Sequence, residues 1–525
     1  MTALRRHPRY NVARRRPWPV ACPPALPQQA VVTMKYVVKF AAEITIKTRP
    51  VRKQFSLRLL SNIRRIFKRR GIDAQAELHW DLIQVVASDQ QAERVAAELQ
   101  SIPGIAHFLQ VVERALPPSS DDSDAEDVLA SIASSTEKVL EKNLRGRTFV
   151  VRCKRQGKHN FTSHDVERYV GGLLLRSSGA TGVRMRDADI TVNLQIKQNR
   201  LFIVQRRFDG LGGYPLGCVG PVLSLMSGGY DSSVASYETT RRGMQTYFCF
   251  FNLGGHAHEV GVKQVSHYLW DRFGSSHRVL FISVPFIDVV GNILANISNP
   301  YMGVVLKRMM YRVASRLADH LEIDAIATGE CVSQVSSQTL RNLVAIDAVT
   351  DKLVLRPLST WDKTSIIHRA ADIGVATYAE HMPEYCAVIS DKPTTAAKMA
   401  VLEREESAFD FALLDDAIER TVMTAIDKVY DSDVGIGDVE MQALPQPGQI
   451  VVDLRHDSEQ EEYPLVLHGN QTLHIPFYKI NSLFSDLDPA KEYLLYCDRG
   501  VMSRLHAAHL RAEGFDNVKV YRPAP

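Results

Sequence analysis

A six-residue loop rich in serine and glycine constrains the fold of this chain more than any other feature. The loop, 227–232 (SGGYDS), follows the apolar run 222–226 and precedes a helical pattern that ends at Gly243. Two glycines let a backbone approach an anion, and a helix N-terminus offers unpaired N–H groups. No GxxxxGK[ST] motif is present, which excludes a Walker A loop. The pattern predicts a phosphate-binding loop between a strand and a helix.

The region around this loop alternates apolar runs with helical periods. Such a rhythm is typical of a parallel sheet with helices on both faces. We therefore predict a doubly wound α/β domain over residues 208–430. Its expected strands lie at 222–226, 246–251, 279–284, 323–328 and 353–356.

The remaining chain divides into smaller regions. A strand, a basic helix and a strand predict a ferredoxin-like α+β domain over 34–93, and a second region with strands and helices follows over 94–207. A linker over 431–445 and a compact α/β domain over 446–525 complete the predicted organisation. The expected elements before residue 208 are strands at 37–40, 45–46, 78–86, 148–152, 189–196 and 201–206, and helices at 55–67 and 128–140.

Charge is distributed unevenly along the chain. The formal net charge is +4, yet residues 1–70 hold 18 Lys and Arg against one acidic residue, Glu43. Residues 145–168 are also basic and include Phe161. Lys and Arg give salt-dependent affinity for phosphates, and an aromatic ring can stack on an exposed base. The asymmetry predicts a nucleic acid partner, and RNA in particular.

The first 33 residues differ from the rest. They hold six Arg, six Pro and no acidic residue, and they lack the apolar core of a secretory signal. We predict a disordered basic extension that the functional protein does not need. The most apolar stretch elsewhere, 279–293, is interrupted by Pro285 and Asp288, so no membrane span is expected.

The cysteines are widely scattered. The closest pair is 31 residues apart, which excludes a CxxC site for zinc or an iron–sulfur cluster and makes a poor disulfide framework. A reducing cytoplasm is the expected location. The seven are Cys22, Cys153, Cys218, Cys249, Cys331, Cys386 and Cys497.

Cys497 lies in the most reactive sequence context of the seven. It follows an apolar run, 493–496, and opens a polar loop before a helix that begins near Arg504. Backbone N–H groups and a helix N-terminus lower the pKa of a thiol and stabilise an anionic persulfide. A cysteine-based phosphatase needs Cys-x5-Arg, whereas here Ser503 occupies that place. The context favours sulfur carriage over phosphate chemistry.

His256, His258 and Glu259 could suggest a metal site. No further ligand at a recognisable spacing accompanies these two His and one Glu, so we predict the start of a helix there instead of a metal site.

Six segments together resemble the tRNA 4-thiouridine synthetase family, whose members are also called tRNA sulfurtransferases. SGGxDS after a strand is the signature of PP-loop ATP pyrophosphatases, and the order of segments extends the resemblance from Met34 to Pro523. The six are EITIK (43–47), GKHNFTSHDVERYVGG (157–172), SGGYDS (227–232), TGECVSQVSSQT (328–339), MPEYCAVIS (382–390) and YCDRGVMSR (496–504).

The resemblance implies a fold and an activity. A ferredoxin-like domain and a THUMP domain (94–207) would bind tRNA, a PP-loop domain would use ATP and Mg²⁺ to adenylate uridine 8, and a rhodanese-like domain would deliver sulfur. A cysteine desulfurase would load Cys497 as a persulfide. Family members also pass sulfur to a ubiquitin-like carrier protein for the thiazole of thiamine, and the residues alone leave that role open for this chain.

The resemblance also implies site residues. Cys386 would form a transient disulfide with Cys497, although by itself it fits core filler equally well. Asp231 and Lys363 would act in adenylation, and Lys307 and Lys363 could instead be solvated surface lysines. The implied ATP contacts are Leu225, Met226, Ser227, Gly228, Gly229, Asp231, Ser232, Lys307, Gly329 and Gln338. The candidate tRNA contacts are Lys47, Arg52, Arg64, Arg65, Lys68, Lys154, Arg155 and Lys158.

Two rival functions remain at this point. A PP-loop synthetase of the amidotransferase type would leave Cys497 and the basic N-terminal regions without a use. An RNA-binding protein with a decayed ATP site is disfavoured by the intact SGGYDS and by the two cysteines.

Overall fold

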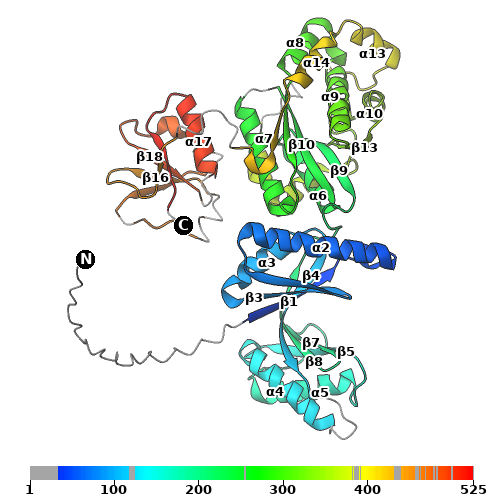
Figure 1. Cartoon of the computed structure of the whole chain (residues 1–525), viewed down its shortest axis with the longest axis vertical. Helices are drawn as coiled ribbons and strands as arrows, with labels where there is room; N and C mark the ends of the chain where they lie inside the picture. Colours follow the sequence, from blue (N-terminus) through cyan, green and yellow to red (C-terminus); the bar gives the residue numbers. More distant parts are fainter. Residues whose placement is uncertain are drawn as a thin grey trace, which may run out of the picture.

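In the computed structural model, the described residues form three β-sheets (Figure 1). No helix in the described part of the chain is long and apolar enough to cross a membrane. The predicted extension 1–33 lies outside this part except for Thr33. The described residues are 33–117, 125–253, 256–380, 382, 390, 392–430, 439–455, 460, 463–467, 469–476, 479–480, 483–497 and 501–523.

The first sheet has eight strands in the order β2-β3-β1-β4-β8-β7-β5-β6. Long antiparallel pairing of β4 with β8 joins its two halves, so both N-terminal regions share one continuous sheet. The strands are β1 (Thr33–Phe40), β2 (Ala74–His79), β3 (Leu82–Ser88), β4 (Ile105–Ala115), β5 (Thr148–Gln156), β6 (Gly182–Val183), β7 (Ile190–Lys197) and β8 (Arg200–Asp209).

Helices cover each half of this sheet and form two separate cores. The long helix α2 buries an apolar stripe that includes Leu59, Ile63 and Phe67, and it ends at Gly71, whose φ of 60° favours glycine. The helices are α1 (Ala42–Thr45), α2 (Arg49–Arg70), α3 (Ala92–Gln100), α4 (Ala125–Leu144) and α5 (Ser163–Ser177).

Two predictions about the first sheet are wrong. The expected strand at 45–46 is the end of α1, a single helical turn whose one buried residue is Ile44. The expected strand at 78–86 is a hairpin, because β2 and β3 meet through Trp80 and Asp81. A two-residue turn preserves the alternation of side chains, so the pattern alone does not reveal it.

The second sheet has the order β13-β12-β9-β10-β11-β14 and is parallel except for β14. Apolar clusters on its two faces confirm the predicted doubly wound fold. The strands are β9 (Gly220–Leu225), β10 (Met244–Asn252), β11 (Leu280–Pro285), β12 (Ala325–Ala327), β13 (Leu353–Leu355) and β14 (Val422–Ala425).

One face of the second sheet carries α6, α7, α11 and α12, and the other carries α8, α9, α10 and α14. The helices are α6 (Tyr230–Arg241), α7 (His256–Leu269), α8 (Ile287–Asn296), α9 (Met302–His320), α10 (Leu340–Asp347), α11 (Lys363–Asp372), α12 (Ala376–Ala379), α13 (Met399–Glu406) and α14 (Ala412–Glu419).

The third sheet is parallel, with the order β15-β19-β18-β16-β17. Its edge strand β15 falls within the predicted linker 431–445. The domain boundaries drawn from the sequence stay predictions. The elements are β15 (Met441–Gln442), β16 (Ile450–Asp453), β17 (Gln471–His474), β18 (Tyr493–Tyr496), α17 (Val501–Ala512) and β19 (Val518–Tyr521).

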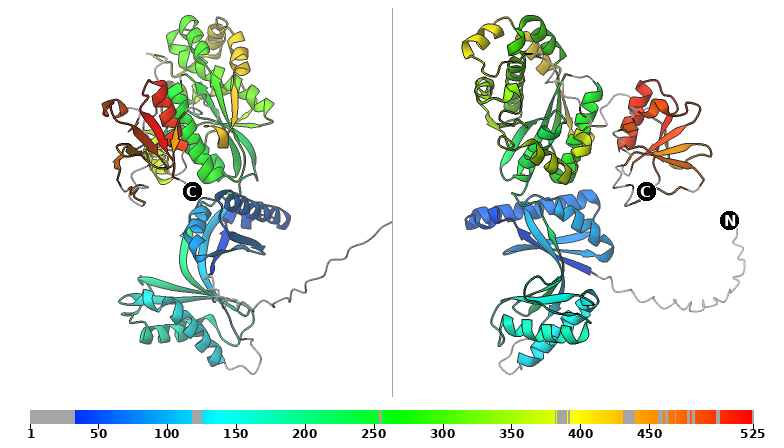
Figure 2. Two further views of the ribbon diagram at one scale, coloured as in Figure 1. Left: turned by 60° about the vertical axis from the view of Figure 1, so that its left-hand side comes forward. Right: turned by 180° about the vertical axis from the view of Figure 1, so that it is seen from behind.

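Helix α2 lies between the first sheet and the part of the chain that contains the second sheet, as the further views show (Figure 2). Asn62 donates to Leu216 O at 3.0 Å, and Arg70 donates to the carboxylate and the backbone oxygen of Asp271 at 2.9 and 2.8 Å. Part of the basic helix is therefore occupied with contacts inside the protein.

Candidate active site

The loop 227–232 connects β9 to α6 and is held by its own serines. Ser232 Oγ accepts a hydrogen bond from the Ser227 N–H and donates to Gly229 O, both at 3.2 Å. Gly228 has a φ of 84°, which favours glycine, and Gly229 is the N-cap of α6. The loop therefore presents backbone N–H groups at a helix N-terminus, as an anion site requires.

Gly329, directly after Thr328 at the end of β12, packs against this loop. A Cβ atom at Gly329 would lie 2.5 Å from the backbone C of Asp231 and the backbone N of Ser232. The strands β12 and β9 are parallel neighbours, so both loops emerge at the carboxyl edge of the sheet, where ligands bind in such folds. This close approach explains why a glycine occupies position 329.

Asp231 and Lys363 meet beside the loop. Lys363 Nζ donates to both carboxylate oxygens of Asp231 at 3.0 Å, and Gln334 Nε2 donates to Oδ2 at 2.8 Å. Lys363 is the first residue of α11, which Asp362 caps through the Ser365 N–H. The structure thus brings together two predicted residues that lie 132 positions apart, and it adds Gln334, which the sequence analysis missed.

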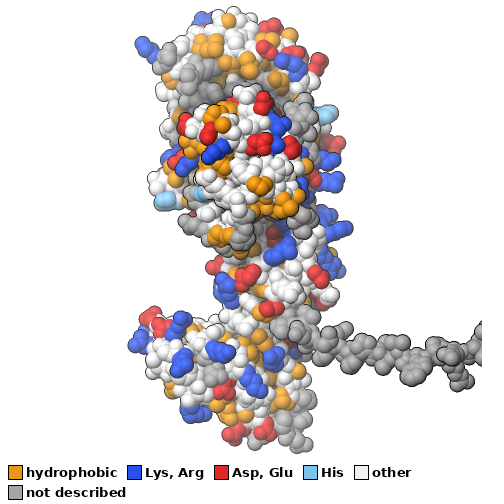
Figure 3. Space-filling model, turned by 90° about the vertical axis from the view of Figure 1, so that its left-hand side faces the viewer, with side chains coloured by type: hydrophobic (Ala, Val, Ile, Leu, Met, Phe, Trp, Pro, Cys, Tyr) orange, Lys and Arg blue, Asp and Glu red, His pale blue; other side chains and the backbone are white. Residues whose placement is uncertain are grey.

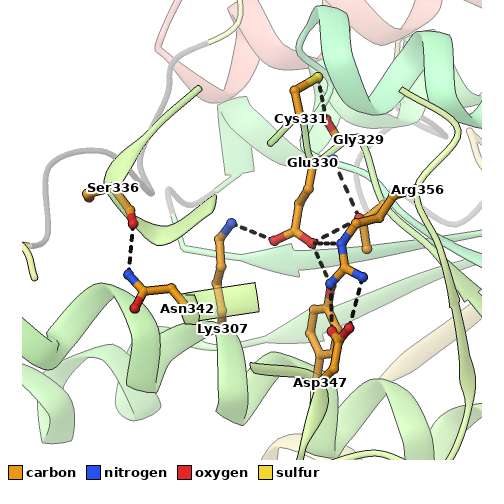
Figure 4. Close-up of polar contacts among 10 residues, drawn as sticks. Lys307, Gly329, Glu330, Cys331, Ser336, Asn342, Asp347 and Arg356 are labelled. Atoms are coloured by element: carbon orange, nitrogen blue, oxygen red, sulfur yellow. Dashed lines mark hydrogen bonds and ion pairs between the residues drawn. The ribbon is translucent and has the colours of Figure 1, made fainter. Parts of the chain in front are cut away.

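Glu330 lies at the centre of a buried polar network (Figure 4). It accepts hydrogen bonds from Lys307 Nζ at 2.7 Å, from Tyr311 OH at 2.8 Å, from Arg356 Nε at 2.9 Å and from Thr328 Oγ1 at 3.2 Å. Burial alone would raise the pKa of this carboxyl, but the charges of Lys307 and Arg356 and the hydrogen bonds outweigh it and lower the pKa to about 2.

The network extends from Glu330 to α10. Arg356 donates to both carboxylate oxygens of Asp347, at 2.9 and 2.6 Å. Lys307, predicted to pair with phosphate, is an ion-pair partner of Glu330 here, and its phosphate contact stays a prediction. Glu330, Tyr311, Arg356 and Asp347 were missed from the sequence, where a single Glu after a strand was the one available signal.

Gln338 is the last residue of a short 3-10 helix, Ser336–Gln338. Its side chain is buried, and Oε1 has no hydrogen-bond partner among the described residues. Such an atom is costly unless a ligand supplies a donor. Leu225 is the last residue of β9, and Met226 follows it and donates its N–H to Cys249 O at 2.8 Å.

His258 supports the loop from α7, which begins at His256 as predicted. Its Nε2 lies 3.0 Å from Ser227 O, and its ring packs edge-on against Phe250. Burial lowers the pKa of His258 and favours the neutral ring.

Cys497 lies at the carboxyl end of β18. Its sulfur accepts the backbone N–H of Ser503 at 3.4 Å, and Ser503 belongs to the first turn of α17. Burial raises the pKa of the other cysteines of the described chain, to about 11 for Cys153, Cys218 and Cys331 and to about 12 for Cys249. Cys497 is thus the described thiol best placed for chemistry. Cys386 lies outside the described residues, as does its predicted disulfide.

The candidate tRNA contacts fall into two groups. Some make contacts inside the protein: Arg64 donates to Ala76 O, Arg65 to Ser276 O, Arg52 to Trp80 O and Arg155 to Gly157 O, and Lys47 lies over the Tyr214 ring. The others, namely Lys68, Lys154 and Lys158, are exposed, as are Lys47, Arg64 and Arg65 of the first group. Figure 3 shows Lys and Arg side chains scattered over the part of the molecule that contains the first sheet. A surface for a polyanion is therefore available.

The Glu330 network should respond to pH. We expect Glu330→Gln to lower the free energy of unfolding at pH 7 by on the order of 3 kcal/mol, because the folded pKa of about 2 lies below the ordinary 4.5. A lowered pKa stabilises the fold above the unfolded value, so the difference should shrink as pH falls from about 5 towards 2. Urea unfolding across this pH range measures the difference in unfolding free energy between wild type and Glu330→Gln. The control is Glu403→Gln, a substitution at an exposed residue. A difference that does not change with pH would contradict this assignment.

Comparisons with known proteins agree with this geometry. Tested against protein families, residues 35–108 match "ThiI ferredoxin-like domain", 126–204 "THUMP domain", 217–411 "Thiamine biosynthesis protein (ThiI)" and 439–523 "Rhodanese-like domain". The solved structure of a 4-thiouridine synthetase in complex with RNA and bound ATP is similar, with 25% identity and a TM-score of 0.64, over 75% of this chain and all of that one.

Curated relatives are similar over nearly the whole chain. The tRNA sulfurtransferase of Pseudomonas putida is 52% identical over 496 residues, which cover 93% of this chain and 100% of the relative. That of Azotobacter vinelandii is 49% identical over 497 residues, which cover 94% and 100%. This chain therefore belongs to the tRNA sulfurtransferase family.

Proposed function

We propose that this protein transfers sulfur to tRNA at the expense of ATP and forms 4-thiouridine at position 8. One observation supports the proposal most directly. The same chain has a loop of the phosphate-binding type beside the Asp231–Lys363 pair, and it also has a cysteine, Cys497, whose sulfur accepts a backbone N–H from a helix. The relatives named tRNA sulfurtransferase and the ATP- and RNA-bound 4-thiouridine synthetase support it.

The first step activates the base. ATP is a substrate whose phosphates would lie against Ser227, Gly228, Gly229 and Ser232, and the uridine O4 attacks its α-phosphate to release pyrophosphate. A carbonyl oxygen is a poor leaving group, whereas AMP is a good one. Adenylation therefore allows a sulfur nucleophile to attack C4 of the uridine and displace AMP. Lys363 provides positive charge at this point.

Asp231 is the carboxylate that would hold Mg²⁺ with the phosphates, because Mg²⁺ in such sites takes one or two carboxylates and substrate oxygens. The ion would neutralise part of the negative charge of the phosphates. In the structure, Lys363 and Gln334 donate to this carboxylate.

Gln338 and Gly329 would shape the rest of the nucleotide site. The buried Gln338 Oε1 offers an acceptor to a ligand donor, and Gly329 lets the chain pass close to the loop. Lys307 donates to Glu330, the residue after Gly329, and would balance phosphate charge from that position.

The second step delivers sulfur from Cys497. A cysteine desulfurase would load a sulfane sulfur onto this thiol, and the Ser503 N–H would stabilise the persulfide anion. The terminal sulfur displaces AMP from C4, and Cys386 closes a disulfide with Cys497 that a reductant of the cytoplasm reopens. The same persulfide could pass to a ubiquitin-like carrier, the role to which the family description refers as thiamine biosynthesis.

Cys497→Ser separates the two steps. We expect the variant to lose 4-thiouridine formation by at least about a thousandfold while AMP formation with tRNA and Mg-ATP continues, because only the sulfur carrier is removed. Thionucleoside analysis of tRNA incubated with a persulfide donor, together with AMP release, measures both. Cys218→Ser is the matched control and should transfer sulfur normally. Retained thiolation by Cys497→Ser would exclude the carrier role.

The exposed lysines of the second N-terminal region should govern tRNA affinity. Reversing Lys154 and Lys158 to Glu should weaken tRNA binding and reduce the slope of log affinity against log salt by about two, one for each lost phosphate contact. Lys138 and Lys142, exposed on α4, provide a control pair with the same charge change. Equal slopes for the two double variants would contradict this surface.

A further inference from the structure

Helix α7 contacts both the nucleotide loop and the C-terminal domain, by which we mean the part of the chain that contains the third sheet and α17. In the first turn of α7, His258 Nε2 lies 3.0 Å from Ser227 O in the loop. Six residues later, Gln264 Nε2 lies 3.2 Å from His506 Nε2 on α17. Figure 1 shows α17 facing α7. One helix therefore joins the proposed ATP site to the domain that carries Cys497.

The contact between Gln264 and His506 is shielded from water. The two residues are 7% and 3% exposed, respectively. An amide nitrogen can only donate, so the ring Nε2 of His506 accepts the hydrogen bond. A buried polar group that loses its partner costs stability, whereas water can serve both groups once the domains separate. The two side chains therefore stabilise the docked arrangement as a pair.

A second contact lies one turn further along α7. The ring of Tyr268 packs against Tyr378 of α12, with the ring centroids 5.2 Å apart, and Tyr378 also contacts the apolar core of the C-terminal domain. Tyr268 OH donates to Ile373 O at 2.9 Å, which fixes the ring. A spacing of four residues places Gln264 and Tyr268 on the same face of the helix. Gln264, Tyr268 and Tyr378 thus form one surface, which we call the α7 docking surface.

The α7 docking surface has the composition of a reversible contact. It combines a polar pair with an aromatic side chain, as interfaces between mobile domains do, and it lacks the uniform apolar character of a permanent core. Reversible docking suits the proposed task of Cys497, because its thiol must receive sulfur from a separate donor protein and then give it to the activated base. The domain that carries this thiol has to present it to two partners in turn.

The docking pair lies close, along each helix, to the functional end of that helix. On α7, His258 precedes Gln264 by six residues, which is roughly 9 Å along the axis. On α17, Ser503, whose N–H is donated to Cys497 Sγ, precedes His506 by three residues, which is roughly 4.5 Å. The contact between the two helices therefore determines where the thiol lies relative to the nucleotide loop.

We propose that Gln264 and His506 are positioning residues: their contact docks the C-terminal domain on α7 in the arrangement from which the persulfide on Cys497 delivers its sulfur. This inference rests on the proposed function, and neither residue takes part in bond making. In the dependent step, the terminal sulfur bonds to C4 of the adenylated uridine, the C4–O bond breaks, and its electron pair leaves with AMP. A thiolate then attacks Cys497 Sγ and enters a disulfide with it, and the electron pair of the broken bond stays on the sulfur at C4.

Gln264→Ala tests the proposal in the full-length protein. Alanine is the better helix former, so α7 itself is not weakened, while His506 loses its donor. With persulfide-loaded enzyme, Mg-ATP and unmodified tRNA, quenched with a thiol reductant, we expect single-turnover 4-thiouridine formation to slow by about tenfold. Pyrophosphate release should stay within about twofold, because the nucleotide contacts are unchanged. Sulfur loading of the peptide that contains Cys497, measured by mass spectrometry, should equal that of wild type.

Three substitutions of histidine complete the kinetic test. His506→Ala should slow the same step, and the double variant with Gln264→Ala should be no slower than either single variant, because both changes remove one contact. His506→Gln should keep most of the rate, because an amide oxygen can accept the same hydrogen bond. His320→Ala, at an exposed residue in the last turn of α9, is the matched control and should behave as wild type.

Small-angle X-ray scattering measures docking without any reference to catalysis. Gln264→Ala and His506→Ala should each have a larger radius of gyration than wild type, because the C-terminal domain spends more time away from α7. His506→Gln and His320→Ala should match wild type. Equal radii for wild type and both alanine variants of the pair would show that the contact does not control docking and would overturn the inference.

The outcomes separate this inference from the proposed function. If wild-type protein forms neither pyrophosphate nor 4-thiouridine, the proposed function fails, and the positioning role fails with it. If wild type is active and Gln264→Ala transfers sulfur at the normal rate, only the positioning role is overturned. A variant that slows pyrophosphate release as much as sulfur transfer, or losses that add in the double variant, would equally overturn it.

Discussion

Backbone crowding at the carboxyl edge of the six-stranded sheet governs the proposed active site. At Gly329 there is no room for a Cβ atom, because the backbone of Asp231 and Ser232 lies 2.5 Å from its position. The loop after β12 therefore packs directly on the start of α6. This packing also sets the position of Glu330, which is the residue after Gly329. The site is shaped first by two backbones, and the side chains are arranged around them.

Two carboxylates beside this contact, those of Glu330 and Asp231, differ in burial and in their hydrogen-bond partners. The difference suits them to different roles. Glu330 has only 8% of its side chain exposed and accepts from four groups, so its charge is fixed in place. Asp231 is 22% exposed and is held by Lys363, whose side chain is 42% exposed. An exposed ion pair contributes little to stability and exchanges partners readily. Asp231 is thus the carboxylate that can change partner when a nucleotide enters, while Glu330 keeps Lys307 in position.

The sequence predicted the parts of the fold that depend on local patterns. The strands around SGGYDS and the doubly wound sheet follow from apolar runs and helical periods, and the structure confirms them. The error at 78–86 arose because a two-residue turn at Trp80 and Asp81 keeps the side-chain alternation. The network of Glu330 with Arg356 and Asp347 could not be predicted, since no local pattern links residues brought together only by the packing of α9 and α10 on the sheet.

In the proposed reaction, the nucleotide loop holds the ATP that activates the base oxygen, so that sulfur from Cys497 can replace it. Single-turnover reaction of tRNA labelled with ¹⁸O at uridine O4 tests this directly, by mass spectrometry of the AMP released. We expect AMP to gain one ¹⁸O for each 4-thiouridine formed, because O4 leaves on the α-phosphate. Unlabelled AMP alongside 4-thiouridine would contradict it.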